Sequence, residues 1–503
     1  MSLSDIKSTP ILYNSFLIQG TTIQNFKKAN VEKKIEKIYE DLKSLNEKKE
    51  NIKYLCLSCI FGGFLGDSMG SCCEFSEKSP KNHLDIFKIE NGIFENGEIT
   101  DDSEMAISAA FAYIDYLSNQ SKINIQDLLY FYYGIWTNSW PKDIGMTVQR
   151  ALSLFNVKRD SIINAKFSNF IKQNTINCNW NSLANGFLMR ISTFIVFFYY
   201  NYYNEIIEIF KSEKESDEYL NLYYLIYIES IKNTEITHPN FENAISSALF
   251  TFMVLTAFIK KKSKDVIDYL KCLLNNKNFE NKIPEIKEYS LNTKIKITNI
   301  FQEIEQNKDF DVFDSMGYYL HAFKLSIFYL YKYNEMENSE KYENKEIPNL
   351  YRYIMEDICD RGGDTDTNCA IVGTLIGPLI GYKKFDQKLF EIFIKYFPSK
   401  RIQYTSALMY YYVNFLEKNC LKIKNKISEE ISNEIVSEEN KIEKESNGKE
   451  NNKTEENEEG GNIKKKKDEG EKKKIEIQEE KKDIEENNKF KFSVFEILLE
   501  FLN

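Results

Sequence analysis

The feature that most limits the possible folds of this chain is a helical spacing of apolar residues, which persists from about residue 54 to about residue 420. Loops rich in Asn, Lys and Ser separate these long apolar segments. Only 20 Gly and 8 Pro occur among the 503 residues, too few for the many turns of a loop-rich β architecture. The 36 Phe and 32 Tyr provide enough apolar surface for a large core. We therefore predict an all-α domain over residues 54–420.

The remaining segments differ in composition from this domain. Residues 24–53 alternate charges at helical spacing and predict a solvated amphipathic helix within an N-terminal extension, 1–53. Residues 421–489 are almost entirely Glu, Lys, Asn, Ile and Gly. Because such a segment buries too little apolar surface to fold, we predict a disordered charged tail. Its KKKK run could serve as a localisation signal, but the acidic residues around it favour a plain solvated tail. The other predicted segments are two insertions between core helices, 204–233 and 260–309, and a short amphipathic segment, 490–503.

The charge balance and the apolar runs indicate a soluble intracellular protein. The formal net charge is −10, which disfavours a general nucleic-acid binder, since such a protein needs a basic face. The most apolar run, 194–203, is much shorter than the ~20 residues that span a bilayer, and the N-terminus lacks a secretory pattern. The nine cysteines are scattered and odd in number, as expected of reduced thiols. We expect a cytoplasmic protein, with the nucleus as the alternative, that binds neither nucleic acid nor membranes.

A zinc site is an alternative use of four of the cysteines, Cys56, Cys59, Cys72 and Cys73. The first two lie inside an apolar helical pattern, where a free cysteine behaves as a small hydrophobic residue. The chain has only three histidines, too few to favour a His-based catalytic zinc cluster. Buried reduced thiols are therefore the favoured interpretation.

Two short acidic clusters carry the most informative chemistry. Residues 100–103, TDDS, stand directly before an apolar-periodic run, and residues 364–367, DTDT, open another. Such residues are preferred N-caps, and the helix dipole favours carboxylates there. A cap needs only one side-chain oxygen, however, and crowded carboxylates repel one another unless a cation neutralises them. Oxygen donors without a nearby His or Cys select Mg²⁺, Mn²⁺ or Ca²⁺. Two such clusters facing each other would form a two-metal site.

A third string, residues 59–75, places glycines at helical spacing in an apolar segment. The glycines are Gly62, Gly66 and Gly70, and the polar residues that interrupt the segment are Asp67 and Glu74. Taken alone, this string predicts close helix packing with a capping Asp.

Together, the strings GDSMGSCCEF, TDDSEMA and GGDTDTNCAIVGTLIG, in this order, resemble the ADP-ribosylglycohydrolase family. Four intermediate strings agree with it: DIGMTVQRAL (143–152), LANGFLMR (183–190), THPNFENAISSAL (237–249) and DSMGYYLHAFKLSIF (314–328). The resemblance covers about residues 55–382 and excludes the N-terminal helix, the predicted insertions and the tail. Two positions depart from the family pattern. Ser103 replaces the usual Thr but keeps the hydroxyl, and ISTF after Arg190 replaces a common Pro-Leu-Gly pattern in the cleft wall.

This resemblance implies a single compact, orthogonal all-α domain with a binuclear Mg²⁺ or Mn²⁺ centre at the bottom of a cleft for ADP-ribose. The implied metal ligands are Thr100, Asp101, Asp102, Asp364, Asp366 and Thr367. Glu74 matches a metal-gating, catalytic glutamate of several branches of the family. The positions that match the ADP-ribose cleft are Gly145, Asn185, Gly186, Met189, Arg190, His238, Gly317 and Tyr318.

The implied activity is hydrolysis of the glycosidic bond at C1″ of the distal ribose, with ADP-ribosylated proteins as substrates and ADP-ribose as product. Either Asp102 or Glu74 would act as the general base. His238 would contact the ligand, with helix capping or packing as the alternative, and Arg190 would either contact the ligand or form a structural ion pair. We expect a monomer. Three other functions stay open: a non-catalytic ADP-ribose-binding or structural relative, a two-metal phosphoester hydrolase, and a scaffold whose charged tail recruits partners.

Overall fold

The computed structural model describes residues 28–46, 51–77, 94, 98–118, 123–138, 141–154, 167–211, 216–308, 310–337, 349–387, 390 and 405–421. The chain forms two compact units, Met1–Lys418 and Asn419–Asn503, and the features argued below belong to the first. The predicted disordered tail and the predicted C-terminal amphipathic segment lie outside the described residues, apart from position 421.

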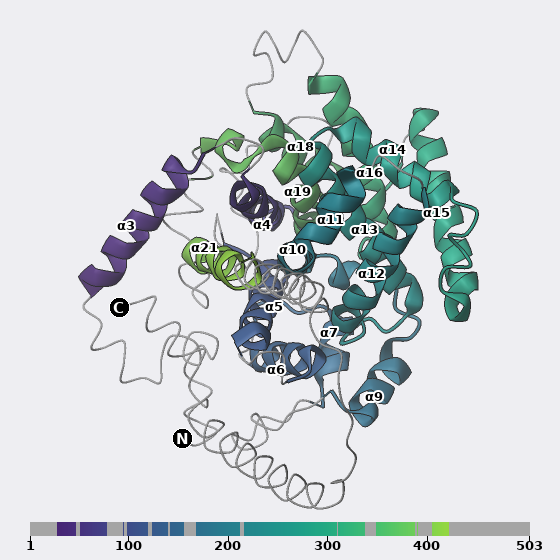
Figure 1. Ribbon diagram of the computed structural model, residues 1–503, viewed down its shortest axis with the longest axis horizontal. Helices are drawn as coiled ribbons and strands as arrows, with labels where there is room; N and C mark the ends of the chain where they lie inside the picture. The colour runs from purple at the N-terminus through teal and green to yellow at the C-terminus, as the bar shows by residue number, and fades with distance from the viewer. Residues whose placement is uncertain are drawn as a thin grey trace, which may run out of the picture. The chain divides into compact units, whose positions relative to one another are not determined.

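The described part of the first unit is helical (Figure 1). In chain order, the helices of the described residues are α3 (Lys28–Ser44), α4 (Ile52–Gly70), α5 (Asp101–Ser118), α6 (Ile125–Thr137), α7 (Met146–Leu152), α9 (Asn169–Asn179), η2 (Asn185–Phe187), α10 (Ile191–Asn201), α11 (Tyr203–Lys211), α12 (Ser216–Thr234), α13 (Phe241–Lys260), α14 (Ser263–Asn275), η3 (Pro284–Ile286), α15 (Lys287–Glu305), α16 (Tyr319–Glu337), α18 (Leu350–Arg361), α19 (Thr365–Ile380), η4 (Tyr382–Lys384), α21 (Thr405–Leu416) and η5 (Glu417–Leu421). Within the described ranges, β pairing is limited to two isolated antiparallel bridges, Ser76 to Gly363 and Ala184 to Tyr318. The prediction of an all-α domain is confirmed for these residues.

Helices α4 and α19, which are far apart in the sequence, pack backbone against backbone (Figure 1). A Cβ at Gly62 would lie 2.3 Å from the carbonyl oxygen of Gly373, and a Cβ at Gly66 would lie 2.3 Å from that of Cys369. Only glycine permits an approach this close. Both helices are apolar on all sides, and all of α19 and all but the first two residues of α4 are buried. This packing brings the end of α4 next to the start of α19.

Two of the predicted outer segments contain helices. Helix α3 lies within the predicted range 24–53, and its residues Ile38 and Leu42 are buried. The hydroxyl of Tyr382 donates a hydrogen bond to the backbone oxygen of Leu42 at 2.7 Å. Helices α11 and α12 occupy most of the range 204–233, and α14, η3 and α15 occupy much of 260–309. That these two ranges are insertions stays a prediction.

Helix α13 is the most apolar long helix of the described residues. By length and composition it could cross a membrane, but 94% of its 18-residue apolar window is buried inside the protein. The side chain of Asn240 caps this helix by accepting a hydrogen bond from the backbone N–H of Glu242 at 2.9 Å. Its burial is that of a core helix.

Candidate metal centre

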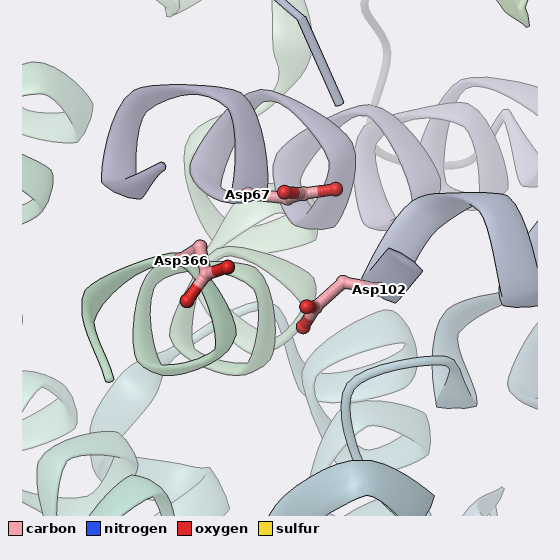
Figure 2. Close-up of side chains that lie close together, drawn as sticks. All are labelled: Asp67, Asp102 and Asp366. Atoms are coloured by element: carbon pink, nitrogen blue, oxygen red, sulfur yellow. The ribbon is translucent and has the colours of Figure 1, made fainter. Parts of the chain in front are cut away.

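Carboxylates from three helices converge where α4 ends and where α5 and α19 begin. Oxygen atoms of Asp67, Asp102 and Asp366 all lie within 4.8 Å of one another. Figure 2 shows these three side chains, from α4, α5 and α19, gathered around one space between the helices. Each of the three is at most 2% exposed. The two acidic clusters predicted to face each other, at 100–103 and 364–367, therefore meet in the fold.

Asp67 holds the start of α5 against α4. Its carboxylate accepts hydrogen bonds from the backbone N–H of Thr100 at 3.1 Å and of Ser103 at 3.2 Å, and from the Ser103 hydroxyl. These bonds satisfy backbone donors that the first turn of a helix leaves free. The sequence predicted a capping Asp here, and the structure shows that the capped helix is α5. Asp67 thereby fixes Asp101 and Asp102 relative to α4.

Asp102 has one carboxylate oxygen that is fully bonded and one that is not. The hydroxyls of Thr100 and Thr367 donate to its Oδ2, at 3.1 and 3.3 Å. Its Oδ1 is buried and has no hydrogen-bond partner. An unpaired buried carboxylate oxygen is costly, and a bound cation would supply the missing partner. Thr100, Asp102 and Thr367, three of the predicted ligands, are thus in direct contact.

A second group of carboxylates shares Asp366 with the first. Oxygen atoms of Glu74, Asp364 and Asp366 all lie within 4.8 Å of one another. Two backbone hydrogen bonds hold the loop that carries Glu74. Phe75 N donates to Gly363 O at 2.8 Å, and Gly363 N donates to Ser76 O at 3.0 Å. Because Gly363 directly precedes Asp364, these bonds fix Glu74 beside the start of α19.

Burial and mutual repulsion raise the pKa values of these carboxylates. Burial, and then the charge of Asp143, raises the pKa of Glu74 to about 8. Burial raises the pKa of Asp67 to about 6, although its hydrogen bonds oppose this shift. The four acidic residues among the predicted metal ligands also have a raised pKa, mainly through burial and further through neighbouring carboxylates: Asp101, Asp102, Asp364 and Asp366. A set of buried, hard oxygen donors that need positive charge fits Mg²⁺ or Mn²⁺.

Asp143 belongs to the same electrostatic site, although the sequence analysis did not select it. After burial, its charge is the largest influence that raises the pKa of Glu74 and of Asp101, and it also raises that of Asp364. The available signal was its position, two residues before Gly145 in a string that matched the family. A single Asp shortly before a short helix is an ordinary candidate for a helix cap, and by itself it does not indicate a metal or catalytic site.

We expect Mg²⁺ to stabilise this protein more strongly at higher pH. The folded-state pKa of Glu74 is about 8, against an ordinary value of 4.5. Between these two pH values, the folded protein therefore binds more protons than the unfolded chain. The stability of the cation-free protein then falls as pH rises through this range. A cation offsets this loss, with about 2.7 kcal/mol of stabilisation per site at 100 times the Kd. Thermal unfolding with Mg²⁺ and with EDTA, at about pH 5 and about pH 8, measures the difference. An equal increase in Tm at both pH values would contradict cation binding by these carboxylates.

Asn185 connects the predicted cleft residues to the acidic cluster. Its Nδ2 donates a hydrogen bond to Oδ2 of Asp364 at 2.6 Å, and its backbone N donates to Gly317 O at 2.9 Å. A Cβ at Gly317 would lie 3.8 Å from the same Asp364 oxygen. Tyr318 pairs with Ala184 in a β-bridge. Asn185, Gly317 and Tyr318 therefore lie together on the Asp364 side of the cluster.

The other predicted cleft residues fall into three sets. The backbone of Gly145 lies close enough to the carboxylate of Asp101 to lower its pKa, which places Gly145 at the cluster. Gly186 follows Asn185 and lies against the ring of His238, whose Cε1 would be 3.0 Å from a Cβ at Gly186.

Met189 and Arg190 are buried, with exposed fractions of 7% and 0%. Among the described residues, the recorded hydrogen bonds of the Arg190 guanidinium go to Met105, Asn233 and Thr237. The ion pairs of the described residues do not include Arg190. The ion-pair alternative for this residue therefore gains no support from them.

The zinc alternative also gains no support from the described part of the chain. Cys56 and Cys59 are buried within α4, and the Sγ atoms of Cys72 and Cys73 lie 3.7 Å apart. The close groups of three metal-ligating side chains found in the described ranges consist of carboxylates alone.

One family model matches most of this chain. The model of the family described as ADP-ribosylglycohydrolase matches residues 49–393. An Acanthamoeba polyphaga mimivirus protein named "Putative ADP-ribosyl glycohydrolase" is 24% identical over 334 residues, which are 64% of this chain and 86% of that protein. A solved structure named "ADP-ribosylglycohydrolase-related protein complex" has 14% identity and a TM-score of 0.45, and the match covers 73% of this chain and 99% of that one. Every predicted site residue lies within the range matched by the family model.

Proposed function

Because this chain belongs to the ADP-ribosylglycohydrolase family, we propose that it is a Mg²⁺-dependent hydrolase that removes ADP-ribose from modified proteins or related conjugates. The bond cleaved is the glycosidic bond at C1″ of the distal ribose. Free ADP-ribose and the unmodified acceptor are the products.

The observation that carries this proposal is the pair of carboxylate groups that share Asp366. All six predicted ligand positions hold oxygen donors, and those of Asp102, Asp364 and Asp366 come from two helix starts that converge. A relative that only binds ADP-ribose has no need to keep so many buried like charges together, since each raises the pKa of its neighbours and costs stability when ionised.

The residues divide between holding cations and moving protons. Mg²⁺ bound by Thr100, Asp101, Asp102, Asp364, Asp366 and Thr367 would polarise sugar hydroxyls and the attacking water. Asp102 is 1% exposed, and its Oδ2 accepts two threonine hydroxyls, so we assign it to cation binding. Glu74 is only partly buried, and its raised pKa suits proton transfer near neutral pH. We therefore assign the general base to Glu74, which takes a proton from the water as an oxocarbenium-like transition state forms at C1″. The hydroxide adds to C1″ as the bond to the acceptor breaks, and the proton then passes to the acceptor.

The test is a panel of arginine-, serine- and poly-ADP-ribosylated proteins, each incubated with the chain and Mg²⁺ and assayed for released ADP-ribose. We expect release from at least one of the three linkages and none after EDTA treatment. The linkage that reacts identifies the acceptor class.

Product identity separates this activity from the alternatives. Release of AMP and ribose phosphate would indicate phosphoester cleavage and overturn the proposal. Calorimetric binding of ADP-ribose without turnover on any of the three linkages would indicate a binding protein instead.

A further inference from the structure

Arg190 is a fully buried cation. Among the described residues, no carboxylate forms an ion pair with its guanidinium. Its Nη2 donates to the hydroxyl oxygen of Thr237 at 2.8 Å and to the backbone oxygen of Asn233 at 3.3 Å. The guanidinium also lies 4.6 Å from the centre of the Tyr133 ring. Burying a charge in this way is costly, so the arrangement needs a physical reason.

The hydrogen bond from Arg190 to Thr237 determines the direction of the hydrogen bond between Thr237 and His238. A guanidinium has only donors, so the Thr237 oxygen accepts from it. The same oxygen lies 2.8 Å from Nδ1 of His238. The Thr237 side chain is completely buried. Among the described residues, its oxygen is hydrogen-bonded to the Arg190 guanidinium, which cannot accept, and to Nδ1 of His238, which can accept its single hydroxyl proton. Thr237 therefore donates to Nδ1, and Nδ1 carries no proton.

The position of the remaining proton on His238 follows. The ring is 1% exposed, and both burial and the positive charge of Arg190 lower the pKa of His238 well below its ordinary value. A neutral imidazole has one N–H, which lies on the nitrogen that accepts nothing. The proton is therefore on Nε2. This atom is buried without a hydrogen-bond partner, and it would lie 3.3 Å from a Cβ at Gly186.

We propose that Arg190 and Thr237 are positioning residues that hold His238 in its Nε2–H form, so that the ring offers a donor beside Gly186 to a phosphate oxygen of ADP-ribose. The choice of ligand rests on the proposed function, whereas the assignment of the proton does not. An N–H group in a dry site attracts an anionic oxygen, whereas the bare Nε2 of the other tautomer would repel it. The charge of Arg190 favours the same anion.

The proton assignment can be measured directly, because the chain has only three histidines, His83, His238 and His321. Two-bond ¹⁵N–¹H spectra of histidine-labelled full-length protein distinguish the two tautomers, and His238→Gln assigns the signals. We expect a protonated Nε2 and an unprotonated Nδ1 in the wild type and in Thr237→Ser. Thr237→Val removes the hydroxyl and should lose this fixed tautomer. A wild-type His238 with its proton on Nδ1 overturns the proposal whatever the protein binds.

The second measurement is calorimetric affinity for ADP-ribose. Thr237→Val should weaken binding by at least about tenfold, as for the loss of one hydrogen bond to a charged group, and Thr237→Ser should restore it. Thr256→Val is the matched control, since Thr256 is equally buried and its hydroxyl bonds within its own helix. Unchanged affinity in Thr237→Val overturns the positioning role. A wild type that does not bind ADP-ribose overturns the proposed function and the ligand assigned here, and the spectra would then still decide the tautomer.

Discussion

Asp366→Asn is expected to reduce Mg²⁺-dependent release of ADP-ribose by about 10³-fold or more. Asp366 is the carboxylate that belongs to both close acidic groups, so its loss weakens cation binding on both sides. Metal-ion catalysis contributes several kcal/mol, and about 4 kcal/mol corresponds to 10³ in rate. The substitution should leave the fold intact, because an Asn oxygen can still accept the 2.8 Å hydrogen bond from the backbone N–H of Thr367.

The stability of this variant gives an independent check. Burial and three neighbouring acidic residues, Asp102, Asp364 and Glu74, raise the pKa of Asp366, so removing its charge relieves repulsion. With EDTA present, Asp366→Asn should unfold at a higher temperature than the wild type, and Mg²⁺ should add less stability to it. Asp268→Asn is the control, because Asp268 is an exposed partner of Lys264 in α14 and its loss should leave the rate unchanged. Wild-type turnover by Asp366→Asn in Mg²⁺ would refute the two-metal assignment.

The acidic clusters could be predicted from the sequence because each occupies four consecutive residues at a helix start. Crowded carboxylates there have few explanations other than a cap or a cation. The convergence of the two clusters could not be predicted from local sequence. Thr367 donates to Asp102 across 265 positions of the chain, and no local spacing encodes such a contact. The family resemblance supplied it, and the glycine-lined contact between α4 and α19 explains it.

Other features of the site had no local signal that could reveal them. Asp67 was predicted to cap a helix, but that this helix is α5 depends on tertiary packing. Asp143 is a single carboxylate whose influence on Glu74 arises only from proximity in the fold. Arg190 lies in an apolar segment, and its bonds to Asn233 and Thr237 reach more than 40 positions along the chain. Residue type alone shows what a side chain can bind, whereas its partners depend on how distant helices pack.

Gly66→Ala is expected to lower the free energy of unfolding by about 3 kcal/mol, the upper end of the usual cost of overpacking. The new methyl group would lie 2.3 Å from the carbonyl oxygen of Cys369 and 2.6 Å from its carbonyl carbon. These are backbone atoms inside α19, so no side-chain rotation relieves the clash and the two helices must separate. Because Asp67 directly follows Gly66 and Asp366 opens α19, the same separation should weaken Mg²⁺ binding.

Gly145→Ala provides the matched control for this substitution. Gly145 also lies at the acidic cluster, but a Cβ there would have no atom within 4 Å, and its backbone angles of −59° and 137° suit alanine. It should be neutral or stabilise the protein by about 0.4–1 kcal/mol through the unfolded state. Urea unfolding of both variants and the wild type, with and without Mg²⁺, gives the comparison. If the Gly66→Ala and Gly145→Ala proteins unfold at the same urea concentration, α4 and α19 do not touch through their backbones. The route by which Asp67 and Asp366 come together would then have to be a different one.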